Sequence, residues 1–311
     1  PPAGALVVNA AFSDAELGPK RFKSVAAAVN AAKAGETVAV ETGEYAEGIV
    51  ARSNVTVVGR CAEKVRLVGT SLEAHGVLAN GAKNAVVRGV TLEGHYEGAR
   101  VMAGGSLDLE DVVIEAPRFV GLIAWQPSSV IHAERVVIRR VKPHASQTVA
   151  VLSVNADEGG TVELLDSVVS ESWEAGVAAT NANASKIPSS VKIHRSVIRA
   201  TNIDERSPSG AGLVVSGVSR AEVTESAILD TRRVGALTVF AEPELVITRS
   251  EIRNTLEDTS GEISAAVYAE GGEITLEDVS IHDVVQGGLL ARSKSTITAR
   301  NTVVHGTKPG A

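Results

Sequence analysis

Short apolar segments alternate with polar residues along nearly the whole chain, and two phrases of this alternation recur. The first is a polar residue, then Val, Ser or Thr, then any residue, then Ile, Val or Leu; it begins at 89 (there with Gly), 111, 135, 166, 195, 225, 249, 278 and 301. The second has the general form Gly-Val-x-Ala and begins at 76, 100, 121, 150, 176, 212, 236, 266 and 288. Alternation with period two predicts β-strands, and several short strands in a repeat of 21 to 36 residues predict a solenoid.

The composition changes the expected number of domains. A chain of 311 residues would ordinarily suggest two domains, but repeat proteins bury each unit against its neighbours and can be longer. Hydrophobic residues make up 44% of the chain and aromatic residues only 3%, which favours a narrow interior of small branched side chains. We therefore predict one domain over 1–311, with an N-terminal strand and capping helix over 1–35 and about ten to eleven rungs over 36–311.

The N-terminal third carries a resemblance to a known family. The segment 22–59 begins with an apolar helical stripe (Phe22, Val25, Ala28, Val29, Ala32) and continues with a Gly-x-Tyr-x-Glu phrase at Gly43, Tyr45 and Glu47. With the repeats, it resembles the right-handed parallel β-helix of the pectin-lyase-like superfamily. The resemblance covers essentially the whole chain and implies an all-β fold. It leaves the activity open, since lyases, hydrolases, esterases, adhesins and inert scaffolds share this fold.

The first position of the first phrase alternates in charge from rung to rung. It reads Asp111, Arg135, Asp166, Arg195, Glu225, Arg249, Asp278 and Asn301. Neighbouring rungs would lie about 4.8 Å apart, so like charges would repel and alternating charges would attract. The resemblance implies a tight turn at which related folds often stack asparagine. We interpret the column as a structural ion-pair ladder that also fixes the register of the rungs.

Charge and cysteine content exclude some classes of function. The net charge is −7 and no basic block is present, so no nucleic-acid partner is expected. No apolar run approaches the roughly 20 residues of a membrane span. Cys61 is the only cysteine, and no cofactor or metal site is predicted. His282 and His305 share a column on adjacent rungs, so their rings can approach each other.

Phrases that carry catalysis in related enzymes are missing. The chain has neither the Gln-Asp-Thr-Leu and Asp-Phe-Ile-Phe-Gly phrases of pectin methylesterases nor the Asp-Asp and Gly-His-Gly signatures of polygalacturonases. It also lacks the clustered aspartates of pectate lyases. The sequence therefore favours a protein that is not an enzyme, with a polysaccharide lyase or glycoside hydrolase with a non-standard site as the alternative.

Three long loops suggest where a ligand would bind. They span 139–149, 199–211 and 253–265, at the same point of the rung, and shorter rungs lie between them. An aromatic ring can stack on a sugar and an arginine can pair with a uronate. The candidate ligand-binding residues are Arg118, His144, Trp173, Arg232, Arg233 and, in another outward column, Trp125.

These features predict a secreted or cell-surface, bacterial-type β-helix module that binds a polysaccharide or a protein partner. A third alternative is a scaffold that self-associates through the last rung, whose strand edges have no cap in the sequence.

Overall fold

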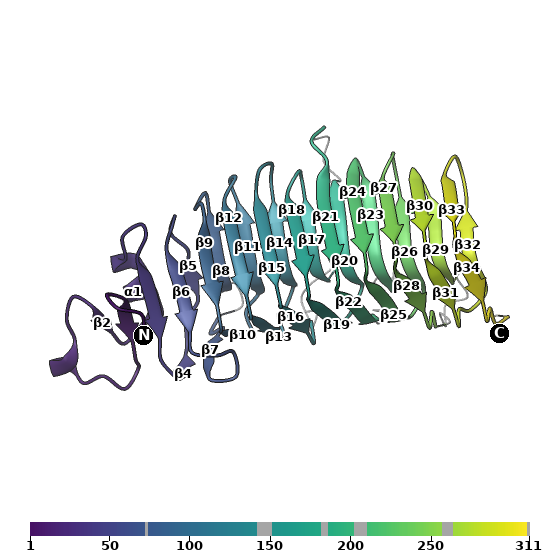
Figure 1. The fold of residues 1–311 in the computed structure, drawn as a ribbon. Coiled ribbons are helices and arrows are strands. Elements are labelled where there is room, and N and C mark those ends of the chain that lie inside the picture. Colours follow the sequence, from purple (N-terminus) through teal and green to yellow (C-terminus); the bar gives the residue numbers. More distant parts are fainter. Residues whose placement is uncertain (72–73, 142–150, 182–185, 202–209, 257–263, 310–311) are drawn as a thin grey trace.

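Each repeat of the sequence forms one rung of a parallel β-helix (Figure 1). The computed structural model describes residues 1–71, 74–141, 151–181, 186–201, 210–256 and 264–309. Strands of successive rungs pair in parallel and build three long sheets, here called A, B and C. The chain passes through A, then B, then C, ten times, and β33 and β34 begin an eleventh rung. The predicted fold class and number of rungs are confirmed.

Sheet A has thirteen strands. They are β1 (Leu6–Val8), β2 (Arg21–Phe22), β3 (Thr37–Val40), β6 (Thr56–Gly59), β9 (Ala85–Arg88), β12 (Ser106–Glu110), β15 (Val130–Glu134), β18 (Thr161–Leu165), β21 (Ser189–His194), β24 (Ser219–Thr224), β27 (Glu244–Thr248), β30 (Glu273–Glu277) and β33 (Thr296–Arg300).

Sheet B has eleven strands. They are β4 (Gly43–Tyr45), β7 (Val65–Val68), β10 (Thr91–Glu93), β13 (Val113–Glu115), β16 (Val137–Arg139), β19 (Val168–Ser172), β22 (Val197–Thr201), β25 (Ala227–Thr231), β28 (Glu251–Arg253), β31 (Ser280–His282) and β34 (Val303–His305).

Sheet C has ten strands. They are β5 (Ile49–Val50), β8 (His75–Asn80), β11 (Glu97–Met102), β14 (Val120–Trp125), β17 (Leu152–Asp157), β20 (Ala175–Asn181), β23 (Ala211–Gly217), β26 (Val234–Val239), β29 (Ala265–Glu270) and β32 (Gly287–Ala291).

One continuous apolar cluster fills the interior from Leu6 to Val284. Its members are mostly Val, Ala, Leu and Ile, as the composition predicted. Alternate residues of each strand point into this cluster, and the residues between them form the outer faces of the sheets.

The N-terminal end is covered by a short helix, α1 (Val25–Ala31), as expected (Figure 1). Val25, Ala28 and Val29 are buried against the first rungs, whereas Phe22, which was expected to join this stripe, lies in β2. Glu47 explains the Gly-x-Tyr-x-Glu phrase, because its carboxylate accepts hydrogen bonds from the backbone N–H groups of Val25 (2.7 Å) and Ala26 (2.9 Å). The phrase is therefore a capping device for α1.

No helix within the described residues is long and apolar enough to cross a membrane. At the C-terminal end, β32, β33 and β34 each have a strand on one side only in the part of the chain that the structure describes.

Candidate functional site

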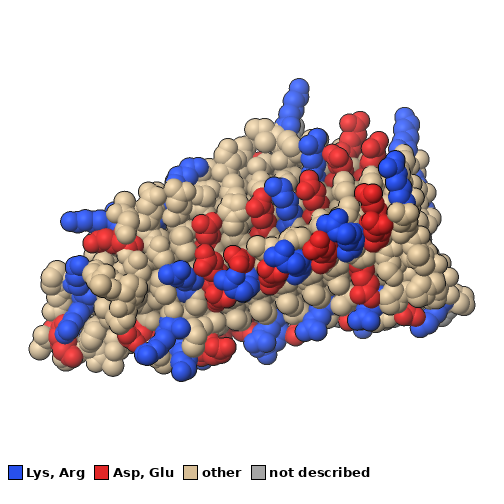
Figure 2. Space-filling view, viewed as in Figure 1, with Lys and Arg blue, Asp and Glu red and all other residues tan. Residues whose placement is uncertain are grey.

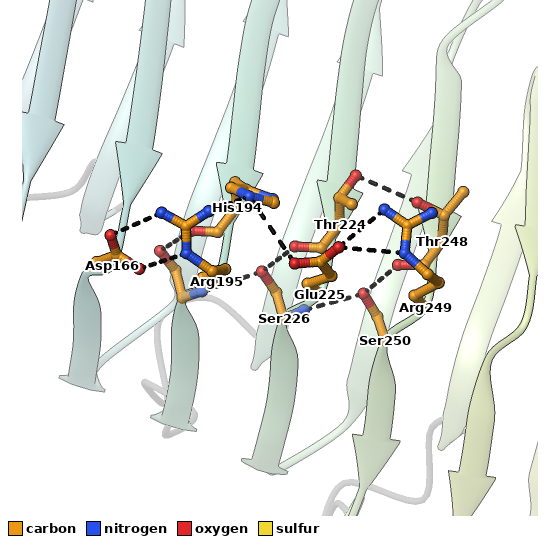
Figure 3. Close-up of polar contacts among 10 residues, drawn as sticks. Asp166, His194, Arg195, Thr224, Glu225, Ser226, Thr248, Arg249 and Ser250 are labelled. Atoms are coloured by element: carbon orange, nitrogen blue, oxygen red, sulfur yellow. Dashed lines mark hydrogen bonds and ion pairs between the residues drawn. The ribbon is translucent and has the colours of Figure 1, made fainter.

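The predicted charge column lies at the corner between sheets A and B, where each member joins a strand of A to a strand of B. Figure 2 shows acidic and basic side chains alternating in rows along the molecule. Ion pairs join Asp111 to Arg135, Asp166 to Arg195, and Glu225 to Arg249. Nε and Nη2 of Arg195 lie 2.8 and 2.9 Å from the two carboxylate oxygens of Asp166 (Figure 3). These hydrogen bonds hold the pKa of the Asp166 carboxyl below its ordinary value.

The column forms three direct ion pairs, and the side chain of His194 lies between the second pair and the third, 3.9 Å from Glu225 (Figure 3). Among the described residues, no hydrogen bond or ion pair joins Arg135 to Asp166 or Arg195 to Glu225, and Asp278 has no ionic partner. Asn301 ends the column at the beginning of the last rung. We propose that the column has a structural role, because every charged member of the three pairs is bonded to a neighbour within the column.

All eight members of the column adopt a left-handed backbone conformation, with φ between 45° and 56°. Apart from glycine, few residues adopt this conformation often; Asn and Asp do so most readily, whereas Arg and Glu rarely do. The turn is therefore maintained by its surroundings rather than by glycine.

A column of buried serines lies directly beside the charges, and the repeat pattern of the sequence did not predict its role. The backbone N–H groups of Val136, Ser167, Ser196 and Ser226 each donate to the hydroxyl of the serine one rung further on, at 3.0 to 3.1 Å. Each hydroxyl donates in turn to the carbonyl two residues before it, as Figure 3 shows for Ser226 and Ser250. These bonds give the buried backbone N–H groups of the A–B corner the acceptors that water cannot supply there.

The predicted ligand-binding residues on the loops are spread along the molecule. Val120, Ala175 and Val234 are aligned in sheet C, and Arg118, Trp173 and Arg232 each precede one of them by two residues. The three candidates therefore share a column, but each lies two rungs from the next. No contact joins any two of them within the described residues. Trp173 packs against the core, and the backbone N–H of Arg233 donates to the carbonyl of Gly210. His144 and most of the three long loops lie outside the described residues.

Trp125, another predicted ligand-binding residue, lies beside the charged side chain of Arg100. It ends β14 on the outer face of sheet C, and the guanidinium of Arg100 lies 5.1 Å from the centre of its ring. This is the geometry of a cation–π interaction. In the register of the sheet Trp125 is aligned with Val239, and the exposed Phe240 lies one residue beyond that column.

A buried carboxylate lies at the beginning of β11, on the same strand as Arg100. The side chain of Glu97 in β11 is only 1% exposed. His75 Nδ1 lies 2.9 Å from one carboxylate oxygen, and Arg100 Nη1 lies 3.2 Å from the other. Neither contact has the angles of a hydrogen bond, so both oxygens of Glu97 are buried without one. His75 and Arg100 are 25% and 23% exposed and bring the cluster to the surface.

An aromatic pair and a buried histidine lie directly before β11 and β14, at the same end of sheet C as Glu97. Tyr96 and Phe119 immediately precede β11 and β14, and their rings stack with centres 5.1 Å apart. His95 is buried, and its Nε2 lies 2.9 Å from the carbonyl of Leu67. Burial lowers the pKa of His95, with a smaller contribution from the positive charge of Arg118, so its ring is neutral at neutral pH.

The sequence did contain a signal for this site. In the register of sheet C, His75 and Glu97 belong to a column that is otherwise apolar: Val120, Leu152, Ala175, Ala211, Val234 and Ala265. Arg100 lies between Leu78 and Ile123 in a second column, which also contains the polar Asn155. Ionisable residues that break an apolar column mark positions where packing alone does not explain the choice of residue.

A second group of charged side chains lies on sheet B near the C-terminus. The rings of His282 and His305 stack with centres 5.1 Å apart, as their shared column predicted. His282 Nε2 lies 2.8 Å from Glu251 and Nδ1 lies 3.0 Å from Asp283. Hydrogen bonds to Asp283 and then to Glu251 raise the pKa of His282. Within the described residues, no three His, Cys, Asp or Glu side chains are arranged to hold a metal ion.

Comparison with known proteins identifies the fold. No protein-family model and no curated protein matches the sequence. Among solved structures, pectate lyase Pel9A matches with a TM-score of 0.64 and 13% identity, over 97% of this chain and 80% of the lyase. The polygalacturonase from Erwinia carotovora ssp. carotovora matches with a TM-score of 0.56 and 10% identity, over 97% of this chain and 96% of the enzyme.

A third match has a different substrate. The catalytic unit of the GH87 alpha-1,3-glucanase from Streptomyces thermodiastaticus strain HF3-3 has a TM-score of 0.57 and 15% identity, over 99% of this chain and 70% of the glucanase. These identities show a shared fold and no more. The chain has the parallel β-helix fold of these structures, as its sequence resemblance implied.

Proposed function

We propose that the protein binds a polysaccharide on the outer face of sheet C, over Trp125 and the cluster around Glu97. The observation that supports this most directly is the guanidinium of Arg100, held 5.1 Å above the Trp125 ring and 3.2 Å from the buried carboxylate. A flat aromatic face with fixed hydrogen-bond donors beside it suits a sugar ring, which has both an apolar face and hydroxyl groups.

The stacked Tyr96 and Phe119 rings extend this surface by one more aromatic pair. The rungs follow each other at about one strand spacing, roughly 4.8 Å, so an extended chain of sugars can contact several rungs at once. Similar folds in a pectate lyase, a polygalacturonase and a glucanase are consistent with this ligand class. A secreted or cell-surface location is part of the proposal. Self-association through the last rung stays a prediction.

The two tryptophans of the chain allow a direct test. In the variant Trp173→Phe, the remaining fluorescence comes from Trp125, and it should change when polygalacturonate, alginate or a neutral β-glucan is added. We expect at least one of these to bind, and Trp125→Ala, measured by calorimetry because it lacks this fluorophore, to weaken its binding about tenfold or more, which corresponds to roughly 1.4 kcal/mol.

Calorimetry with the same polysaccharides compares the two candidate surfaces. If Trp173→Ala weakens binding and Trp125→Ala does not, the ligand lies on the long loops rather than on the face of sheet C. If no polysaccharide binds to the wild-type protein, the proposal is wrong.

A further inference from the structure

The outer face of sheet A carries a second charge column beside the one at the A–B corner. In the register of the sheet it reads Asp108, His132, Glu163, Lys192 and Glu222, so acidic and basic residues alternate in it too. Glu163 binds both of its neighbours, since His132 Nδ1 and Lys192 Nζ each lie 2.8 Å from its carboxylate. Asp108 and Glu222 form no ion pair in the part of the chain that the structure describes.

The two columns alternate in phase, because each rung from β12 to β24 has the same kind of residue in both. The members that share a rung are Asp108 and Asp111, His132 and Arg135, Glu163 and Asp166, Lys192 and Arg195, and Glu222 and Glu225. This face is therefore crossed by bands that are acidic and basic in turn, and Figure 2 shows the alternation along the molecule.

Ion pairing within the chain does not explain this phase. Two residues three positions apart along a strand are separated by roughly 10 Å, and like charges at that distance repel each other, although salt screens them. The opposite phase would keep every pair between neighbouring rungs and would turn this repulsion within a rung into attraction. The bands therefore point to a surface that they face.

The repeat distance of the bands selects the partner. Successive rungs lie about 4.8 Å apart, so a complementary surface must reverse its charge at the same interval over several steps. A second copy of this chain has that spacing along its whole length. If two copies face each other across a two-fold axis with their helix axes parallel, each rung meets its own equivalent and like charges oppose. With antiparallel axes, a two-fold axis between two rungs sets opposite charges face to face.

We propose that two copies of this chain associate through the outer face of sheet A and the A–B corner, with the two-fold axis between the rungs of β18 and β21. This surface is separate from the face of sheet C that is proposed to bind a polysaccharide. The opposed residues of the two copies are Glu163 and Lys192, His132 and Glu222, Asp166 and Arg195, Arg135 and Glu225, and Asp111 and Arg249. Symmetry makes each of these contacts occur twice.

The other outward residues of sheet A fit the same register. Glu134 faces Thr224 of the second copy, and Arg88 faces its Glu277. Neither contact joins like charges. With the two-fold axis one rung nearer the C-terminus, Glu134 would face Glu277, and fewer opposite charges would meet. The sequence of charges therefore favours one register.

The size of the surface predicts a weak dimer that depends on charge. Six rungs and the width of the strands of sheet A give a face of roughly 29 Å by 17 Å, or about 500 Å² per copy. Specific complexes ordinarily bury about 800 Å² per partner. Because the contacts are between exposed charges, salt should dissociate the dimer.

Sedimentation velocity of the full chain measures this association. We expect a dimer in about 20 mM salt and a monomer in about 0.5 M salt. Lys192→Glu with Arg195→Asp makes the rung of β21 acidic, and Glu163→Lys with Asp166→Arg makes the rung of β18 basic. Each double variant alone should raise the dissociation constant at least about tenfold, because like charges then face each other beside the two-fold axis.

An equal mixture of the two double variants separates association from folding. In a mixed dimer, every acidic side chain of these two rungs on one copy faces a basic side chain on the other. The dissociation constant should therefore return to within about threefold of the wild-type value. Both variants lose the same ion pairs within the chain, so damage to the fold cannot produce this recovery, and circular dichroism checks each variant alone.

The chain offers a matched control in Arg199→Glu with Arg253→Glu. This variant changes the net charge by the same amount as Lys192→Glu with Arg195→Asp, but both residues are exposed in one column on the outer face of sheet B. It should leave the dissociation constant unchanged.

Three outcomes would overturn the proposal. They are a wild-type protein that stays monomeric at low salt, a dimer that both double variants retain, and a mixture that stays monomeric. Val303→Lys changes a residue of the last rung that is 58% exposed, and a dimer that only this change abolishes would place the interface there instead. Trp125→Ala should leave the association unchanged, so this proposal and the polysaccharide site can fail separately.

Discussion

The serine column at the A–B corner predicts the effect of the substitution Ser196→Ala. The Ser196 hydroxyl accepts a hydrogen bond from the backbone N–H of Ser167 at 3.0 Å and donates one to the carbonyl of His194 at 2.8 Å. The substitution removes both bonds. The carbonyl of His194 keeps a second partner, the N–H of Asp166 at 3.1 Å. Only the N–H of Ser167 is therefore left without an acceptor.

Burial sets the magnitude of this effect. Ser167 and Ser196 are each 2% exposed, so water cannot readily take the place of the lost hydroxyl. A buried donor without a partner costs about 1–3 kcal/mol, and we expect Ser196→Ala to lower the free energy of unfolding by that amount. Ser190→Ala is the matched control, because Ser190 lies on the outer face of the same strand, β21, and should change stability by less than about 0.5 kcal/mol.

Urea unfolding followed by circular dichroism measures the global effect, and native-state hydrogen exchange measures the local one. The amide of Ser167 should exchange roughly 5 to 150 times faster in Ser196→Ala, since each 1.4 kcal/mol is a factor of ten. Equal stability of Ser196→Ala and Ser190→Ala, together with unchanged exchange at Ser167, would refute the reasoning.

Three further predictions concern charge, backbone conformation and pH. Arg195→Asp should lower the thermal midpoint, and the added change Asp166→Arg should restore part of it, since the exchanged pair then lies beside the like charges of Arg135 and Glu225. The restored part should shrink in 1 M salt, and a double variant as unstable as the single one would contradict the pairing. Gly94→Ala should lower the free energy of unfolding by about 1 kcal/mol, because φ is 62° and nothing lies near the added Cβ. Gly272→Ala should lower it by more, because its Cβ would lie 1.9 Å from the carbonyl oxygen of Pro243. Equal losses of stability in urea unfolding would contradict this. The raised pKa of His282 stabilises the fold while the ring is protonated, fully below about pH 6.5, and this contribution is lost as the pH rises through the raised value. His282→Asn should therefore flatten the pH dependence of the thermal midpoint above about pH 6.5, and an unchanged dependence would count against this ion pair.

The sequence predicted the fold because each rung repeats the same alternation of inward and outward residues. Apolar residues at every second position specify strands, and a recurrence every 21 to 36 residues specifies parallel stacking. The conformation of the A–B corner could not be predicted in this way. Glycine is the usual sign of a left-handed turn, but this corner has Asp, Arg and Glu with φ of 45° to 56°. Neighbouring rungs impose that conformation, and no single rung encodes it.

The charge column was predicted, but its division into pairs was not. Alternating signs are equally compatible with a continuous ladder and with separate pairs, because each arginine has an acidic residue on both sides. In the structure Nε and Nη2 of Arg195 bind Asp166, whereas Nη1 contacts His194 and no hydrogen bond joins Arg195 to Glu225. The sequence determines the order of charges in a column, whereas side-chain packing determines which neighbour each charge selects.

Neither the search for catalytic motifs nor the long loops predicted the candidate site. Its only mark in the sequence is a pair of ionisable residues in an otherwise apolar column of sheet C. His75 and Glu97 lie 22 residues apart in the sequence, and only the register of the rungs places them side by side. A charge in a β-helix is informative relative to the other residues of its column. At the A–B corner charge is the rule, so Arg195 indicates structure. In sheet C the column that His75 and Glu97 share otherwise contains Val, Leu and Ala, so these two residues are exceptions that a folding requirement does not explain. Once the register is known, comparing each residue with its own column separates these two cases without any catalytic motif.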